Sequence, residues 1–159
     1  MSQANQRPPK IPESVLVIVH TPALDVLLIE RADKLGYWQG VTGSKDELHE
    51  DLCTTARREV AEETGIVVGS PGIAFEALQN WQLINVYEIY PFWRYRYAPG
   101  VTHNTEHVFG LTVPVGTTVK LSPREHVNYV WLPWRDAADL CFSPSNAEAV
   151  LQLPRFVST

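Results

Sequence analysis

The sequence lacks the features that place a protein in a membrane or outside the cell. No apolar run approaches the roughly 18 residues that cross a bilayer, and the N-terminal segment, MSQANQRPPKIPES, is polar and Pro-rich without an apolar signal core. Only two cysteines are present, Cys53 and Cys141, and neither belongs to a C-x-x-C motif. We therefore expect no structural disulfide, no membrane partner and a cytoplasmic protein.

Positive charge is also scarce. The chain has 13 Lys and Arg against 18 Asp and Glu, which gives a net charge of -5 at pH 7. Because nucleic-acid binding usually needs a basic surface, we expect no nucleic-acid partner. A few local arginines would still suffice to hold a small phosphorylated ligand.

The order of hydrophobic patterns predicts an α/β domain with a mixed sheet. The 159 residues and the hydrophobic fraction of 45% fit a single domain over residues 1–159, with residues 1–13 as a flexible arm. Strands are expected over residues 14–20, 25–31, part of 37–44, two within 75–98 that break near Pro91, 105–115 and 128–133. Helices are expected over residues 49–65, 135–142 and 145–156, the last capped by Ser145 or Asn146.

The longest of these helical patterns ends with three glutamates at a position that a helix disfavours. Gly65 is expected to close the helix in the left-handed conformation, and the negative end of the helix dipole lies there. Glu59, Glu62 and Glu63 nevertheless precede it, within an arc of roughly 100° beside the apolar stripe. These like charges repel one another unless a cation such as Mg²⁺, which prefers carboxylate oxygens, binds among them. The alternative is a solvated acidic face.

The residues around these glutamates resemble the Nudix box, G-x5-E-x7-R-E-U-x-E-E-x-G-U, in which U is a bulky aliphatic residue. The matching positions are Gly43, Glu50, Arg58, Glu59, Val60, Glu62, Glu63, Gly65 and Ile66. The loop SKDELH between Gly43 and Glu50 is one residue longer than the family pattern. An extra residue before the helix can be absorbed by the loop, whereas one inside the helix would rotate the carboxylates apart.

The resemblance implies a Nudix-type α/β/α sandwich with a mixed sheet, one catalytic helix after the Nudix loop and helices at the C-terminus. It implies that Glu59 and Glu63 bind Mg²⁺, with Mn²⁺ as a possible substitute, and that Glu62 binds metal or activates water. Arg58 would hold the glutamates in place, and Glu50 would support the metal site from the start of the helix. The implied reaction is hydrolysis of a nucleoside-diphosphate-linked compound.

An aromatic and basic stretch, FWRYRYAPGVTHNTEHVF, follows over residues 92–109. In an extended strand, Arg94 and Arg96 would share one face, while Trp93, Tyr95 and Tyr97 would share the other. Arginines suit phosphates and aromatic rings stack on flat heterocycles. The alternative is a half-buried strand whose arginines only reach out to solvent.

This stretch closely resembles the Nudix subfamily that hydrolyses dihydroneopterin triphosphate in folate biosynthesis. The resemblance runs across most of the chain: it includes VLLIER and YWQGVTGS before the helix, and RYAPGVT and NTE within this stretch. It implies conversion of 7,8-dihydroneopterin triphosphate and water to the monophosphate and pyrophosphate. Trp38 and the aromatic residues near Tyr97, with Tyr97 itself, are candidates for the pterin pocket, although Trp38 could equally belong to the core. Arg31, Arg94 and Arg96 are candidates for the phosphates.

One further acid and two alternative functions complete the expectations. Glu125, in SPREHVNYVWL, matches a subfamily glutamate that reaches the metal from outside the box. The first alternative is a general (deoxy)nucleoside triphosphate pyrophosphatase, since purines and pterins are both flat bicycles. The second is a non-catalytic, ligand-sensing Nudix domain, although such domains usually lose box carboxylates that this chain retains. The sequence leaves open whether Glu62, Glu125 or another group takes the proton from water.

Overall fold

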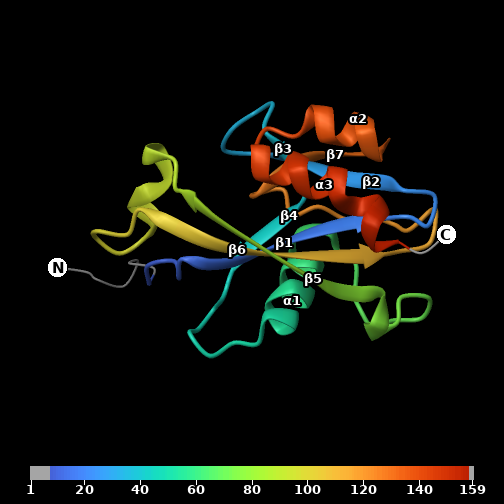
Figure 1. The fold of residues 1–159 in the computed structure, drawn as a ribbon, viewed down its shortest axis with the longest axis horizontal. Helices are drawn as coiled ribbons and strands as arrows, with labels where there is room; N and C mark the ends of the chain where they lie inside the picture. The colour runs from blue at the N-terminus through green and yellow to red at the C-terminus, as the bar shows by residue number, and fades with distance from the viewer. Residues whose placement is uncertain (1–7, 158–159) are drawn as a thin grey trace.

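The computed structural model describes residues 8–157, which form one mixed sheet with helices on both sides (Figure 1). Its strands are β1 (Glu13–His20), β2 (Asp25–Arg31), β3 (Trp38–Gln39), β4 (Val41–Ser44), β5 (Leu78–Glu88), β6 (His103–Thr112) and β7 (His126–Pro133). The helices are α1 (Leu52–Thr64), α2 (Trp134–Leu140) and α3 (Pro144–Phe156), with short 3-10 helices η1 (Phe75–Ala77) and η2 (Pro91–Arg96). The expected α/β/α sandwich is confirmed.

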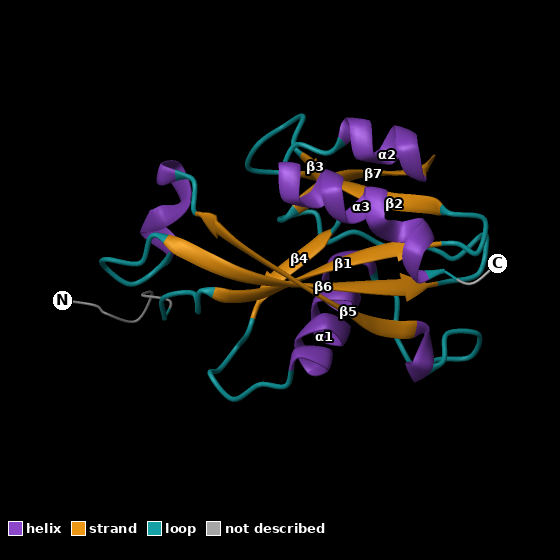
Figure 2. Cartoon of the chain, in the orientation of Figure 1, coloured by secondary structure: helices purple, strands orange, loops and turns teal. Residues whose placement is uncertain are grey.

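β1 is the strand around which the sheet is organised. One of its edges pairs with β6 in parallel over the whole length, from Glu13 to His20. The other edge is divided, because β4 pairs antiparallel with its first half and β2 meets it only where His20 faces Val26. The sheet therefore opens between β2 and β4, and Figure 2 shows β4 leading from this opening into the loop before α1.

The core lies in two layers, one on each face of the sheet. On one face, Ala56 and Val60 of α1 pack against alternate residues of β1. On the other face, Val150 and Leu153 of α3 pack against the remaining ones. Residues 15–19 are accordingly all buried. This explains why the sequence of β1 is continuously apolar and does not alternate between apolar and polar residues.

The two cysteines lie on opposite faces of this sheet. Cys53 of α1 packs against the α1 layer, whereas Cys141 packs against the α3 layer, and both are free thiols. The sheet between them keeps them from forming a disulfide with each other.

The N-terminal arm differs from the expectation at its inner end. Residues 1–7 of the expected arm lie outside the described residues. Lys10, however, donates its backbone N–H to the carbonyl of Arg96 at 2.8 Å and forms a β-bridge with Tyr97. β1 then begins at Glu13. A distant segment thus supplies the backbone partner for Lys10, and the flexibility of residues 1–13 stays a prediction.

The second strand expected within residues 75–98 is also wrong, because the segment from Pro91 to Arg96 is the 3-10 helix η2. Proline fits the first turn of a helix, and the aromatic residues of this segment pack on one another. The rings of Tyr90 and Phe92 stack at 5.4 Å, and Trp93 meets Tyr90 edge-on at 5.7 Å. The alternation of arginines and aromatics on two strand faces is consequently absent.

The start of α3 shows why its cap was misassigned. The helix begins at Pro144, a residue suited to the first turn, so Ser143 takes the N-cap position. Asn146 instead has a tertiary role, since its Oδ1 accepts a hydrogen bond from the Gly40 N–H at 2.9 Å.

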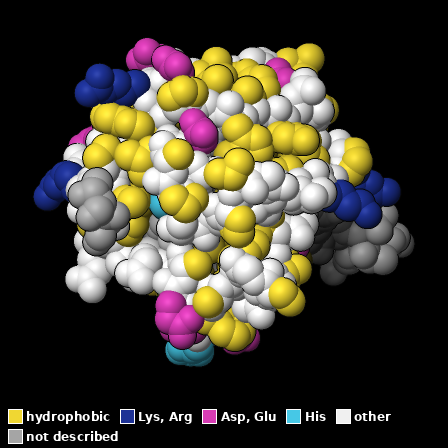
Figure 3. Space-filling view, turned by 90° about the vertical axis from the view of Figure 1, so that its right-hand side faces the viewer, with side chains coloured by type: hydrophobic (Ala, Val, Ile, Leu, Met, Phe, Trp, Pro, Cys, Tyr) yellow, Lys and Arg dark blue, Asp and Glu magenta, His cyan; other side chains and the backbone are white. Residues whose placement is uncertain are grey.

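The surface offers little basic area on the face shown in Figure 3. There the Lys and Arg side chains stand apart near the edges and form no continuous patch. Within residues 8–157, no helix combines the length and the apolar character that a membrane crossing requires.

Candidate active site

α1 has well-formed ends. The Asp51 side chain accepts a hydrogen bond from the Cys53 N–H at 3.1 Å, which caps the N-terminus. Gly65 closes the C-terminus with φ of 75°, and its N–H donates to the Ala61 carbonyl at 3.0 Å. The prediction that Gly65 ends the helix is confirmed, and no basic residue occupies the last turn to offset the glutamates.

Arg58 joins the carboxylates of the Nudix box. Its Nη2 donates to Glu50 Oε1 at 2.8 Å and to the Ser44 carbonyl at 3.1 Å, and its Nη1 donates to Glu59 Oε1 at 2.8 Å. Its Nη1 also lies 3.6 Å from a carboxylate oxygen of Glu62, whose side chain is 54% exposed. One guanidinium thus joins the end of β4, the loop and the helix.

Glu50 is held as an anion at the start of this network. Hydrogen bonding from Arg58 lowers its pKa to about 2, with further help from Thr55 and the backbone of Asp46. The Thr55 hydroxyl donates to it at 2.6 Å. Glu50 therefore fixes the orientation of Arg58 and is poorly suited to carrying a proton.

Gly43 lies directly against Glu59. A Cβ atom added to Gly43 would fall 1.9 Å from the Glu59 carboxyl carbon, so only glycine allows this approach. Gly43 pairs with Val15 within β4, and the extra residue of SKDELH is taken up in the loop that follows this strand. Burial raises the pKa of Glu59 to about 7, against the opposing charge of Arg58.

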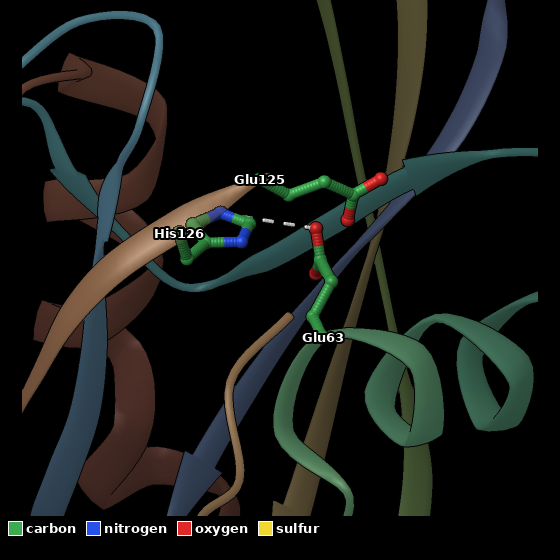
Figure 4. Close-up of side chains that lie close together, drawn as sticks. All are labelled: Glu63, Glu125 and His126. Atoms are coloured by element: carbon green, nitrogen blue, oxygen red, sulfur yellow. Dashed lines mark ion pairs between the residues drawn. The ribbon is translucent and has the colours of Figure 1, made fainter. Parts of the chain in front are cut away.

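Glu63, Glu125 and His126 form a compact cluster beside the helix end (Figure 4). One ligand atom from each lies within 4.8 Å of the others. Glu63 is 4% exposed, and its Oε2 has no hydrogen-bond partner. Burial, and then the charges of Glu59 and Glu125, raise its pKa well above the usual value.

His126 completes this cluster. Both of its ring nitrogens are buried without a hydrogen-bond partner, and Nε2 lies 3.9 Å from Glu63 Oε1. Burial lowers its pKa to about 4, so the ring is neutral at neutral pH. Sequence reasoning did not place His126 among the site residues, although its position beside Glu125 was a usable signal.

These groups fit a divalent cation. A buried carboxylate oxygen without a partner is costly, and the burial and neighbouring carboxylates that raise the pKa values of Glu59 and Glu63 would be offset by a bound positive charge. Carboxylate oxygens favour hard ions such as Mg²⁺, whereas imidazole nitrogens favour softer ions. The glutamates of this site, rather than His126, are therefore the ligands suited to Mg²⁺.

A cavity of about 310 Å³ adjoins this cluster on the α3 side of the sheet. Thr42, Gly43 and Ser44 of β4 line one wall, and residues 142–146 line another. Gly43 therefore contacts the cavity on one side and Glu59 on the other. At this point, β4 alone lies between the cavity and the Glu59 carboxylate.

Three cations line the cavity: Lys10, Arg31 and Arg96. Arg31 is fixed by Asp33, which accepts from its Nε at 2.7 Å and Nη2 at 2.8 Å, and its guanidinium lies 4.3 Å from the centre of the Trp93 ring. Burial, then Arg96 and Arg31, lower the pKa of Lys10 to about 8. Positive groups that repel one another in this way favour an anionic ligand.

The predicted substrate residues divide into two groups. Arg31, Arg96 and Tyr97 line the cavity. Trp38 packs against the α3-side core, and Arg94 is held by Glu88 and by the Ile89 carbonyl, which accepts from its Nε at 3.0 Å. These two side chains are not brought into the cavity, because η2 replaces the expected strand and β3 turns Trp38 toward the core.

Sequence reasoning missed much of the cavity lining. The missed residues include Lys10, Tyr87, Asn104, Glu106 and Phe142. Lys10 fell within the expected arm, and Phe142 comes from the far end of the chain. Asn104 and Glu106 had a usable signal, since NTE places two polar residues on the inward face of an otherwise apolar strand.

Comparison with known proteins gives a consistent result. The family profile described as the NUDIX domain matches residues 10–153. The dihydroneopterin triphosphate diphosphatase of Escherichia coli (strain K12) is 39% identical over 144 residues, which cover 90% of this chain and 92% of that protein. The Haemophilus influenzae enzyme of the same name is 35% identical over 140 residues, 87% of this chain and 84% of the other. The solved structure of the E. coli dihydroneopterin triphosphate pyrophosphohydrolase superposes with a TM-score of 0.83 at 38% identity, covering 95% and 98% of the two chains.

Proposed function

This chain belongs to the Nudix family, and we propose that it hydrolyses 7,8-dihydroneopterin triphosphate to the monophosphate and pyrophosphate, a step of folate biosynthesis. The two relatives named for this activity cover nearly the whole chain. The observation that carries the proposal is the position of the cavity. Three cations and several aromatic side chains line it, and Gly43 in its wall also lies against Glu59 of α1, which brings the cavity next to the carboxylates.

Glu59, Glu63 and Glu125 are the proposed ligands of a divalent ion, Mg²⁺ with Mn²⁺ as a substitute. The orphaned Oε2 of buried Glu63 is the structural support for this assignment. A bound ion would neutralise phosphate oxygens and lower the pKa of an attacking water.

The remaining residues position the substrate and the carboxylates. Lys10, Arg31 and Arg96 hold the triphosphate, because their charges converge on the cavity. Arg58 fixes the Glu59 carboxylate and is itself fixed by Glu50.

Glu62 is the proposed acceptor of the proton from water, because it is the box glutamate at α1 that is open to water and is not among the proposed metal ligands. The Glu62 side chain is 54% exposed, whereas Glu59 and Glu63 are largely buried. Glu125, also exposed, is the alternative acceptor.

Product analysis tests the proposed reaction. The purified protein with Mg²⁺ and 7,8-dihydroneopterin triphosphate should yield pyrophosphate and the monophosphate in equal amounts, and a chelator should stop the release. Stepwise release of orthophosphate, or equal rates with and without the chelator, would contradict the proposal.

A general (deoxy)nucleoside triphosphate pyrophosphatase is the second candidate. It is favoured by the aromatic walls of the cavity, with Tyr87, Tyr90, Trp93 and Phe142 among its lining residues, since such rings stack on any flat bicycle.

A further inference from the structure

Two buried polar side chains face the cavity from β6. Asn104 and Glu106 lie two residues apart on one face of the strand, line the cavity and are each 2% exposed. Nδ2 of Asn104 donates to Ser14 Oγ at 2.7 Å and to the Tyr87 hydroxyl at 3.1 Å, which leaves its Oδ1 without a partner. Both side chains therefore present acceptor atoms on the cavity side of the strand.

Glu106 is poorly compensated for so buried a carboxyl group. Its one hydrogen bond to a neighbouring amide, from Asn85 Nδ2, is 3.5 Å long. Burial raises its pKa, against the effects of Asn85 and the nearby Ser145 side chain. A buried polar group without full hydrogen bonding is costly, so a ligand that offers N–H donors would be favoured here.

The sheet register sets the spacing between Glu106 and β4. Glu106 pairs with Ser14 of β1, and Ser14 pairs with Ser44 of β4. Two interstrand spacings amount to about 10 Å. A ring bound at Glu106 would thus leave its phosphate chain to extend across β1 to β4, where Gly43 meets Glu59. Tyr87 and Phe142 line the cavity and offer aromatic surface for the ring.

We propose that Glu106 determines specificity by binding the 2-amino-4-oxopyrimidine edge of the substrate. Its carboxylate would accept two hydrogen bonds, one from the ring N–H and one from the exocyclic amino group, with Asn104 Oδ1 as a neighbouring acceptor. Pterins and guanine carry this pair of donors and adenine does not. The inference rests on the function proposed above and adds the group that reads the heterocycle.

The test compares substrates that differ at this edge. The probes are 7,8-dihydroneopterin triphosphate, dGTP and dITP, of which dITP lacks only the 2-amino group of dGTP. For the wild-type protein we expect kcat/KM for dGTP to exceed that for dITP by about tenfold or more, because losing a donor leaves a buried acceptor unpaired. Glu106→Gln should lower kcat/KM for dGTP and dihydroneopterin triphosphate by about tenfold, mainly through KM, and should bring the dGTP to dITP ratio to within about threefold of unity.

The control is Glu76→Gln, which removes an exposed carboxylate that does not line the cavity and should leave all three values unchanged. Equal values for dGTP and dITP in the wild-type protein would overturn the proposal even if Glu106→Gln fails to fold. An unchanged ratio in a folded Glu106→Gln variant would also overturn it. The preference between dihydroneopterin triphosphate and the nucleotides tests the proposed function separately, because the dGTP to dITP ratio does not depend on it.

Discussion

At the end of α1, one arginine keeps several carboxylates in fixed positions. Arg58 donates to Glu50 and Glu59 and lies near Glu62, so the charges that disfavour this helix end are partly neutralised from within. Glu63 has no such partner and is the most buried of the box glutamates. The residue that is least stabilised by the protein is therefore the one most suited to an external cation.

Replacing Glu63 with glutamine tests whether this site is catalytic. We expect Glu63→Gln to lower kcat by at least ~10²-fold in saturating Mg²⁺, a loss typical of a preorganised electrostatic group. Steady-state kinetics with dihydroneopterin triphosphate measures it, with Glu148→Gln, an exposed residue of α3, as the control. Wild-type rates for Glu63→Gln would exclude Glu63 from catalysis, whereas a wild-type protein that hydrolyses no substrate would support the non-catalytic, ligand-sensing alternative.

The contact between Gly43 and Glu59 is a second test at a single residue. Gly43→Ala places a methyl group on the Glu59 carboxylate, so we expect an activity loss of about tenfold or more and a stability loss of about 1–3 kcal/mol. Gly116→Ala is the matched control, because its φ of 83° strains alanine but nothing lies within 4 Å. It should lose stability and keep its activity. Full activity in Gly43→Ala would show that this approach is unimportant.

Elements whose form depends on nearby residues could be predicted from the sequence, whereas elements whose form depends on distant contacts could not. The end of α1 and the spacing of its glutamates depend on residues within a few turns, so the box could be assigned directly. η2 was mistaken for a strand, since its form depends on Tyr90 and Trp93 packing on each other. The NTE pattern marks Glu106 as an inward polar residue of β6, but the cavity that it lines follows from the register of β6 with β1, which the local pattern does not reveal.

The link between the loop and α1 predicts a pH dependence of stability. Arg58 lowers the pKa of Glu50 to about 2 from 4.5, so its stabilising effect is complete above about pH 4.5 and is lost as the pH falls through about 2. Glu50→Gln should therefore destabilise the protein most at neutral pH, and the difference from wild type should shrink below pH 4.5.

Urea unfolding between pH 7 and pH 3 measures this difference. Glu47→Gln, in the exposed part of the same loop, should follow the wild-type curve. A difference between Glu50→Gln and wild type that is constant over this range would contradict the account of the Glu50–Arg58 pair.

In the whole molecule, the two faces of the sheet have separate tasks. The α1 face carries the carboxylate cluster, and the α3 face carries the cavity. They meet at β4, where the divided edge of β1 leaves room for Gly43 to contact both. Even the segment before β1 contributes, because Lys10 is held against Arg96 and reaches the cavity.

Lys10 tests this arrangement. Lys10→Ala should raise KM for dihydroneopterin triphosphate by about tenfold with a smaller change in kcat, since it removes a charge-assisted contact to the phosphates. Lys120→Ala removes an exposed lysine outside the cavity and should leave KM unchanged. An unchanged KM in Lys10→Ala would exclude Lys10 from substrate binding.

The substrate preference of the wild-type protein tests the central claim most directly. The measurement is steady-state kcat/KM for 7,8-dihydroneopterin triphosphate, dATP and dGTP under the same Mg²⁺ concentration. The account predicts the highest value for dihydroneopterin triphosphate. A preference of about tenfold or more for either nucleotide, which is about 1.4 kcal/mol in transition-state binding, would contradict it.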